Sequence, residues 1–295
     1  MNSWKRITIL LPTGVLLLLA GCATQQARFV QPPNVGSATP WTNKEFKADP
    51  NEFQFAVVSD RHGGCRRGVF TNALEKLNLL QPEFVMSVGD LINGGTEDLA
   101  RLDAEYEEMD DFLGGLEMRF FRVVGNHDIS NPVMLGEYKK RYGLPYYHFL
   151  YKDVLFLSVC TEDRAADGSI SGEQVAYMKK AITDNKDARW TFLFMHRPLF
   201  VPKDGKLEKP WAEIEEAIKD RPHTVIAGHW HNYGKRVKHG QSYIHLATTG
   251  GGSGLEGIQH GKFDHIVWIT MTSEGPRIAN LMLDGIHSED VRLDE

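Results

Sequence analysis

The apolar residues of this chain fall into short continuous runs that alternate with longer segments in which they recur at helical spacing. Short runs rich in Val, Ile and Phe predict β-strands, whereas recurrence at every third or fourth position predicts amphipathic helices. The predicted strands cover residues 53–59, 83–88, 119–124, 153–159, 189–195 and 223–227. The predicted helices cover residues 67–80, 96–113, 134–142, 172–183 and 211–219.

This alternation of strands and helices predicts an α/β fold in which helices are layered on a sheet. The order changes at residue 242, from which consecutive strands are predicted up to residue 283. We expect these late strands to form a second sheet packed on the first. Glycines at 250–252 interrupt them, and because the spacing of a phosphate-binding P-loop is absent, we expect a tight turn between strands there.

The first 21 residues have the layout of a secretory signal peptide. Lys5 and Arg6 precede an apolar run over residues 7–20, which is too short to span a bilayer as a mature helix. The following Gly21-Cys22 completes the sequence LAGC, which resembles a bacterial lipobox. That resemblance implies that Cys22 is lipidated and becomes the new N-terminus; the alternative is an ordinary cleaved signal with an accidental cysteine. We therefore expect a protein of the bacterial cell envelope, anchored to the membrane through lipid on the periplasmic side, with the outer membrane suggested by Ala23.

Residues 22–50 are polar and contain Pro, Gly, Asn and Thr without any apolar period, which predicts a flexible tether. Residues 51–295 are long enough for one large domain. The net charge of −6 gives no electrostatic basis for a nucleic-acid partner. Besides Cys22 the chain has Cys65 and Cys160, for which a disulfide and two separate thiols both remain open.

Polar residues directly follow five of the predicted strands. These are Asp60-Arg61-His62, Gly89-Asp90, Gly125-Asn126-His127-Asp128, His196-Arg197-Pro198 and Gly228-His229-Trp230-His231. In open α/β sheets the carboxyl ends of the strands line the ligand crevice, so these groups are expected to converge. Imidazole and carboxylate ligands together suit Zn, Fe, Mn or Ni. Because the polar side chains outnumber the ligands of one ion, we expect two divalent metal ions that share a bridging carboxylate.

The ordered set D-x-H, G-D, G-N-H-D, H and G-H-x-H, from Asp60 to His231, resembles the calcineurin-like metallophosphoesterases. The resemblance implies a sandwich of two mixed sheets flanked by helices, in four αββα layers. It assigns Asp60, His62 and His231 to one metal and Asn126, His196 and His229 to the other. It assigns Asp90 to both metals as the bridge and leaves His127 uncoordinated, facing the leaving group.

One position departs from two branches of that family. Three residues after the bridging Asp90, Ser/Thr protein phosphatases carry an Asp that orients the histidine, followed by an Arg, and purple acid phosphatases carry a Tyr that binds iron. This chain has Asn93-Gly94 instead. The pair disfavours both branches and leaves open what orients His127.

The expected activity is hydrolysis of a phosphate ester by a metal-bridging hydroxide, with His127 as general acid. Alternatives are a non-catalytic lipid-anchored binding protein and a metallohydrolase that acts on a non-phosphate substrate. Arg61, Arg197 and Trp230 are candidate substrate contacts. The alternatives are surface salt bridges for the two arginines and a space-filling role for the tryptophan. Asp128 either polarises the site or bonds a loop amide.

Overall fold

The computed structural model describes residues 42, 47, 49–163 and 170–286. The predicted signal peptide, Cys22 and nearly all of the predicted tether lie outside the described residues. From Asp49 onward the chain forms one compact unit. No helix in the described part of the chain is long and apolar enough to cross a membrane.

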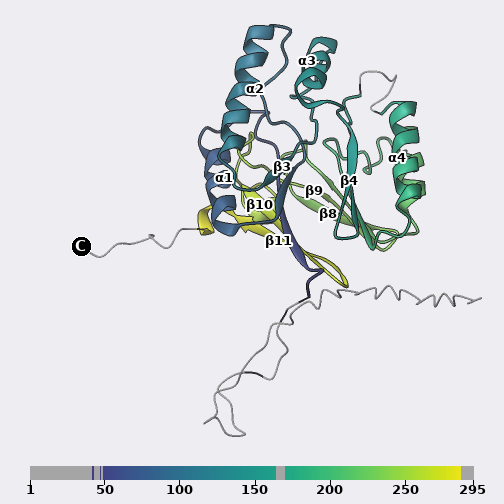
Figure 1. The fold of residues 1–295 in the computed structure, drawn as a ribbon. Helices are drawn as coiled ribbons and strands as arrows, with labels where there is room; N and C mark the ends of the chain where they lie inside the picture. The colour runs from purple at the N-terminus through teal and green to yellow at the C-terminus, as the bar shows by residue number, and fades with distance from the viewer. Residues whose placement is uncertain (1–41, 43–46, 48, 164–169, 287–295) are drawn as a thin grey trace, which may run out of the picture. The chain divides into compact units, whose positions relative to one another are not determined.

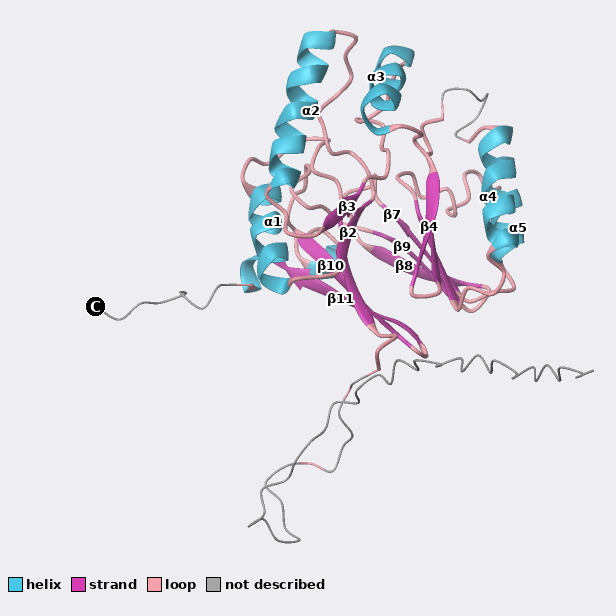
Figure 2. Cartoon of the chain, viewed as in Figure 1, coloured by secondary structure: helices cyan, strands magenta, loops and turns pink. Residues whose placement is uncertain are grey.

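Two mixed sheets form the centre of this unit (Figures 1 and 2). The five-stranded sheet has the order β11-β10-β1-β2-β3, with β1 parallel to β2 and antiparallel to β10. Its strands are β1 (Phe53–Val58), β2 (Phe84–Ser87), β3 (Arg119–Phe121), β10 (His265–Thr272) and β11 (Gly275–Met282). The six-stranded sheet has the order β4-β5-β6-β7-β9-β8. Its strands are β4 (Tyr147–Tyr151), β5 (Val154–Ser158), β6 (Trp190–Phe194), β7 (His223–Ala227), β8 (Gly234–Lys238) and β9 (Gln241–His245).

The late strands do not form a sheet of their own, so that expectation was wrong. β9 pairs in parallel with β7 and forms a hairpin with β8, which places both in the six-stranded sheet. The chain then crosses over residues 246–264 to the other sheet, where β10 pairs antiparallel with β1 along its free edge. Hydrophobic period identifies a strand but not its partner, because pairing depends on contacts distant in sequence.

Helices cover the outer face of each sheet (Figure 1). On the five-stranded side these are α1 (Val69–Leu80) and α2 (Leu99–Gly114); on the six-stranded side they are α4 (Gly172–Asp184) and α5 (Lys209–Ile218). The remaining helices are α3 (Pro132–Tyr142), η1 (Ile258–His260) and η2 (Leu283–Gly285). Asp98, Asn131 and Ser171 accept hydrogen bonds from first-turn amides, which fixes where α2, α3 and α4 begin. The layers confirm the predicted two-sheet α/β sandwich.

Three apolar clusters correspond to the three gaps between these four layers. Along β1, Phe53, Phe55 and Val57 pack between the sheets, and Ala56 and Val58 pack under the helices. Aromatic rings dominate the gap between the sheets; for example, the centroids of the Phe55 and Phe156 rings lie 5.3 Å apart. Because the central strands are buried on both faces, their sequences read as continuous apolar runs.

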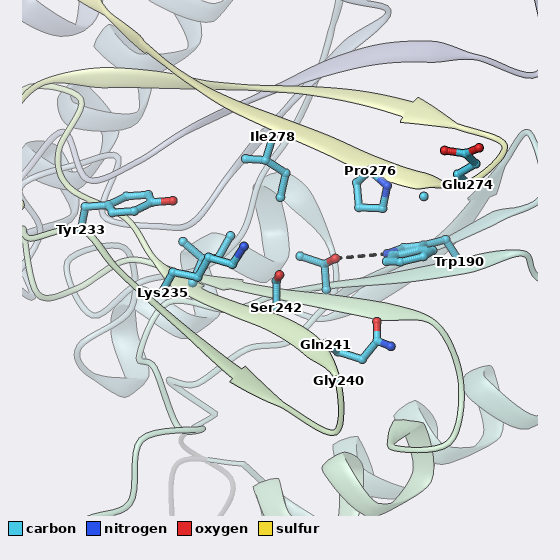
Figure 3. Close-up of a pocket in the computed structure, with 12 residues that line it drawn as sticks. Trp190, Tyr233, Lys235, Gly240, Gln241, Ser242, Glu274, Pro276 and Ile278 are labelled. Atoms are coloured by element: carbon cyan, nitrogen blue, oxygen red, sulfur yellow. Dashed lines mark hydrogen bonds between the residues drawn. The ribbon is translucent and has the colours of Figure 1, made fainter.

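A small cavity of about 280 Å³ lies between the six-stranded sheet and β11 (Figure 3). Trp190 spans part of it and donates a hydrogen bond to Thr224 at 3.2 Å. None of the predicted metal ligands lines this cavity. The predicted ligands instead follow β1, β2, β3, β6 and β7, in the loops after the carboxyl ends of those strands.

Candidate metal centre

Two groups of ligand side chains meet where these strands end. The ligand atoms of Asp60, Asp90 and His231 lie within 4.8 Å of one another. Those of Asp90, His196 and His229 do so as well, so Asp90 belongs to both groups. A carboxylate shared in this way is the arrangement that a pair of neighbouring cations requires.

Two further predicted ligands lie next to these groups. The Oδ1 atom of Asn126 is 3.0 Å from Nε2 of His196, which brings the amide oxygen to the second group. His62 is half-buried, its backbone N–H donates to the Asp90 carbonyl at 3.0 Å, and its ring centroid is 6.5 Å from that of His127. His62 belongs to neither compact group and lies at the edge of the centre, next to His127.

Several of the predicted ligands have a backbone conformation that residues other than glycine rarely adopt. Asp90, His229 and His231 have φ values of 57°, 73° and 54°, in the left-handed region. Such conformations persist only where the surrounding structure holds them, and they concentrate at functional sites. The glycines beside the ligands allow the close packing, since a Cβ on Gly125 would lie 2.3 Å from Asp90 Oδ1 and one on Gly228 would lie 2.4 Å from Asp60 Oδ2.

Backbone carbonyls fix which nitrogen of two histidines faces the centre. Nδ1 of His196 bonds the Val88 carbonyl at 2.9 Å, and Nδ1 of His231 bonds the Gly252 carbonyl at 2.6 Å. A carbonyl can only accept, so Nδ1 carries the hydrogen and Nε2 is left free to bind a cation. Gly252 lies in the loop between β9 and η1, so the glycines at 250–252 support the centre and do not form the tight turn between strands that we expected.

The charges at the centre suit divalent cations. Asp60 and Asp90 are 0% and 2% exposed, and within the described part of the chain their ion pairs are with His196 and His231. Burial alone would lower the pKa of His196, but Asp90 and Asp60 raise it to about 9. Burial, together with neighbouring positive groups, lowers the pKa of His62 and of His229 to about 4, which keeps these imidazoles neutral. Buried carboxylates beside imidazoles, two of which are neutral, form a donor set that fits a transition-metal pair.

Asp128 bonds loop amides, which is one of the two roles considered for it. Its carboxylate accepts hydrogen bonds from the backbone N–H groups of Asp90, Leu91, Ile92 and Gly125, at 2.8–3.2 Å. Burial and the neighbouring Asp90 raise the pKa of Asp128 to about 6, whereas these amides favour its ionised form. Asp128 therefore ties the loop that carries Asp90 to the loop that carries Asn126 and His127.

The partner that orients His127 is a backbone carbonyl. Nδ1 of His127 lies 2.7 Å from the carbonyl oxygen of Asn93, in the place where a carboxylate was missing from the sequence pattern. Gly94, with φ +58°, passes so close that a Cβ there would lie 1.7 Å from the His127 carbonyl oxygen. Helix α2 holds this turn, because Glu105 accepts from the Gly94 N–H at 2.7 Å and Arg101 donates to the Gly94 carbonyl at 2.9 Å.

The candidate substrate contacts differ in whether other groups of the protein already bind them. Arg61 is buried and donates to Glu108 at 2.6 Å and to a backbone carbonyl. Arg197 pairs with Glu162 at 2.5 Å and also lies 3.1 Å from Nε2 of His229. These pairings favour salt bridges for both arginines.

Trp230 is 42% exposed, and its ring stands edge-on to His245. Cys65 and Cys160 are both free thiols. The sequence left two questions open at the centre. The structure answers them with the Asn93 carbonyl, which bonds His127, and with Asp128, which bonds loop amides.

A family model described as calcineurin-like phosphoesterase matches residues 53–233. No curated protein matches the chain. Among solved structures, GAP50, "the anchor in the inner membrane complex of Plasmodium", has a TM-score of 0.60 at 14% identity, covering 80% of this chain and 86% of its own. A dimetal phosphatase from Danio rerio has a TM-score of 0.54 at 13% identity, covering 77% and 98%. Purple acid phosphatase PPD1 from yellow lupin seeds has a TM-score of 0.57 at 13% identity, covering 81% and 53%. At these identities the structural likenesses show a shared fold.

The family match covers more than half of the chain and includes every residue of the two ligand groups. The residues that the structure gathers at the strand ends all lie within the matched range. The chain therefore belongs to the calcineurin-like phosphoesterase family and is a metal-dependent phosphoesterase.

Proposed function

We propose that the chain hydrolyses a phosphate ester at a pair of divalent cations, with His127 as the general acid. The observation that carries this proposal is the position of Asp90 in both ligand groups. One cation would be held by Asp60, His62 and His231, and the other by Asn126, His196 and His229, with Asp90 shared. Mn, Fe, Zn and Ni all suit this donor set.

The charge balance favours an anionic substrate. Bound divalent cations would supply a water of lowered pKa as nucleophile and would stabilise negative charge on the phosphate oxygens. Asp60 and Asp90 offset only part of the charge of two such cations. The centre would therefore be positive within a chain whose net charge is −6, and it would attract a phosphate group locally.

His127 would deliver the proton that the leaving oxygen needs. Because the Asn93 carbonyl can only accept, Nδ1 keeps its hydrogen, and an acidic proton must reside on Nε2. That nitrogen is on the side of Gly63 and His231, 3.7 Å from where a Cβ on Gly63 would lie. The carbonyl holds the ring in orientation, and the proton leaves from Nε2 to the alkoxide.

Catalysis is tested with the purified domain after chelation and reloading with Mn²⁺. We expect turnover of bis-p-nitrophenyl phosphate or p-nitrophenyl phosphate that disappears on chelation and returns with metal. A fully metal-loaded chain that cleaves neither ester with Mn²⁺, Fe²⁺, Zn²⁺ or Ni²⁺ would contradict the proposal.

We also propose that the chain is a lipoprotein of the bacterial cell envelope, anchored through Cys22 on the periplasmic side. The lipobox-like LAGC sequence at residues 19–22 supports this proposal. Residues 22–50 would then act as a tether between the lipid and the phosphoesterase domain. Two or three acyl chains would hold the protein durably, because one chain alone binds a membrane only marginally.

Replacement of Cys22 by Ser should abolish lipidation and release the protein from the membrane fraction. Intact-mass measurement of the chain purified from cells should show acyl chains on the wild type and none on Cys22→Ser. Cys65→Ser is the matched control and should stay membrane-bound. Wild-type protein recovered without detergent in the aqueous fraction would show that the anchor does not exist.

A further inference from the structure

A cavity of about 600 Å³ opens beside the metal centre, between the loop after β1 and helix α2. Its walls include His62, Cys65, Arg67, Phe70, Asn93 and Phe112. Two of these residues connect it to the proposed chemistry, since His62 is a predicted ligand and the Asn93 carbonyl bonds His127. The volume is within the range of pockets that hold small organic molecules.

The cavity adjoins the proposed general acid, because His62 and Asn93 line it and both lie next to His127. His127 is fixed by Asn93 at Nδ1, and its ring faces the His62 ring at a centroid distance of 6.5 Å. Nε2 of His127 faces Gly63, whose neighbour His62 lines the cavity, so an alcohol that receives its proton there is close to the cavity wall. The rest of that alcohol has space to extend there, away from the buried carboxylates.

Most of the charged groups around this cavity are already neutralised. Arg61 pairs with Glu108 at 2.6 Å. Arg66 binds both oxygens of Asp264 at 2.6 Å and also donates to the Gly251 carbonyl. The Glu105 carboxylate pairs with Arg101 of its own helix at 2.8 Å and accepts from the Gly94 N–H at 2.7 Å.

Arg67 is the exception among these charges. Its side chain is exposed, and within the described residues it has no ion pair or side-chain hydrogen bond. Once the pairs are accounted for, the cavity keeps one free guanidinium, whose planar fork matches a carboxylate or a phosphate. The buried ring of Phe70 and the ring of Phe112, which packs 5.0 Å from the Arg61 guanidinium, give the cavity an apolar wall.

We infer that the substrate is a phosphate ester whose leaving alcohol carries a second anionic group, a carboxylate or a phosphate, and that Arg67 binds this group in the cavity. The inference rests on the proposed phosphoesterase activity and adds the class of substrate to it. The alcohol lies against the apolar wall while its phosphate ester binds at the centre and its second anion binds Arg67.

The test compares Arg67→Gln with the wild type on matched esters. Phenyl, 4-carboxyphenyl and 4-phosphonophenyl esters are each used as the phosphate monoester and as the methyl phosphodiester. The substituent also changes the leaving-group pKa, but this effect is the same for both enzymes and cancels when the variant is compared with the wild type. We expect the wild type to prefer the charged esters. In Arg67→Gln the ratio of kcat/KM for charged over phenyl ester should fall about tenfold, as expected for loss of one charge-assisted hydrogen bond. The carboxylate and phosphonate arms show which anion is bound.

Arg277→Gln is the matched control, because Arg277 is an exposed arginine on β11, outside the cavity lining. It should keep the wild-type ratio. Cleavage of the phenyl esters with the same ratio in wild type and Arg67→Gln would overturn this inference and leave the proposed function intact. A wild-type chain that cleaves none of the esters would instead overturn the proposed function, and this inference with it.

Discussion

The Asp90→Asn variant should fold, bind at most one divalent cation and lose more than about 100-fold in kcat/KM. Loss of even an outer partner of a metal ligand costs about 10–100-fold in metal affinity, so loss of a ligand shared by two cations should cost more. Asn is the informative replacement, because it tolerates the left-handed φ of 57° at this position and keeps an oxygen for the His127 N–H. What it removes is the charge. Elemental analysis after dialysis and kcat/KM on p-nitrophenyl esters provide the two readouts.

The chain offers a matched control for this substitution. Asp153 also has a left-handed φ, 59°, in the turn between β4 and β5, and is exposed. Asp153→Asn should bind metal and turn over substrate as the wild type does. Two cations per chain in Asp90→Asn, with the control also unaffected, would show that Asp90 is not the bridge.

The pH dependence of metal binding provides a second readout of the same carboxylate. Asp90 and Asp60 raise the pKa of His196 to about 9 in the metal-free chain, although burial opposes them. His196 is therefore protonated at neutral pH, and a cation must displace that proton. Metal affinity should rise between pH 7 and about pH 9 and fall below that range. In Asp90→Asn the rise should shift to lower pH, because the variant lacks the carboxylate charge that most raises the pKa of His196.

The central strands could be predicted from the sequence because both of their faces are buried. β7 was predicted at its observed bounds, 223–227, since all of its side chains are buried. The edge strands β4 and β8 were not predicted, because their residues are half-buried or exposed and include polar side chains. Strand pairing could not be predicted either. The division of the late strands between the sheets depends on the crossover at residues 246–264, which has no hydrophobic period.

The candidate site was predictable to the extent that side chains define it. Asp60, Asp90, His196, His229 and His231 were all expected near one another because each directly follows a strand. The groups that hold them were not predictable, because most are backbone atoms. Every residue has a backbone carbonyl, so the sequence does not mark the carbonyls that fix His196 and His231. The left-handed conformations follow from tertiary contacts. Gly94 was the available signal for the close turn at His127, since a side chain there would overlap the His127 carbonyl.

His127→Ala should reduce hydrolysis of alkyl esters far more than hydrolysis of p-nitrophenyl esters, at unchanged metal content. General acid catalysis contributes about 10²–10⁴-fold where the leaving group needs a proton. An alkoxide needs that proton, whereas p-nitrophenolate leaves without it, so the first class should lose about that factor. The backbone N–H of residue 127 still donates to Asp90 in the variant, so the loop should stay in place. His260→Ala, at an exposed histidine in η1, is the control.

Glu105→Gln tests whether helix α2 orients His127 through the backbone of Asn93 and Gly94. The two carboxylate oxygens of Glu105 accept from Gly94 N–H and from Arg101, at 2.7 and 2.8 Å, and an amide can serve only one of them. The turn should loosen and the Asn93 carbonyl should lose its position against Nδ1 of His127. We therefore expect a smaller loss than in His127→Ala, with the same preference for alkyl esters. Glu107→Gln, on the exposed face of the same helix, should have no effect.

The pattern of losses across both esters separates a proton donor from a residue that only holds its loop. If His127 merely supported Asn126, His127→Ala would lower metal occupancy and reduce both kinds of ester alike. Equal losses at full metal occupancy would show that His127 does not donate the proton, and water would then be the proton source. A selective loss on alkyl esters in His127→Ala, repeated in weaker form by Glu105→Gln, is expected only if the imidazole donates the proton and the Asn93 carbonyl sets its direction.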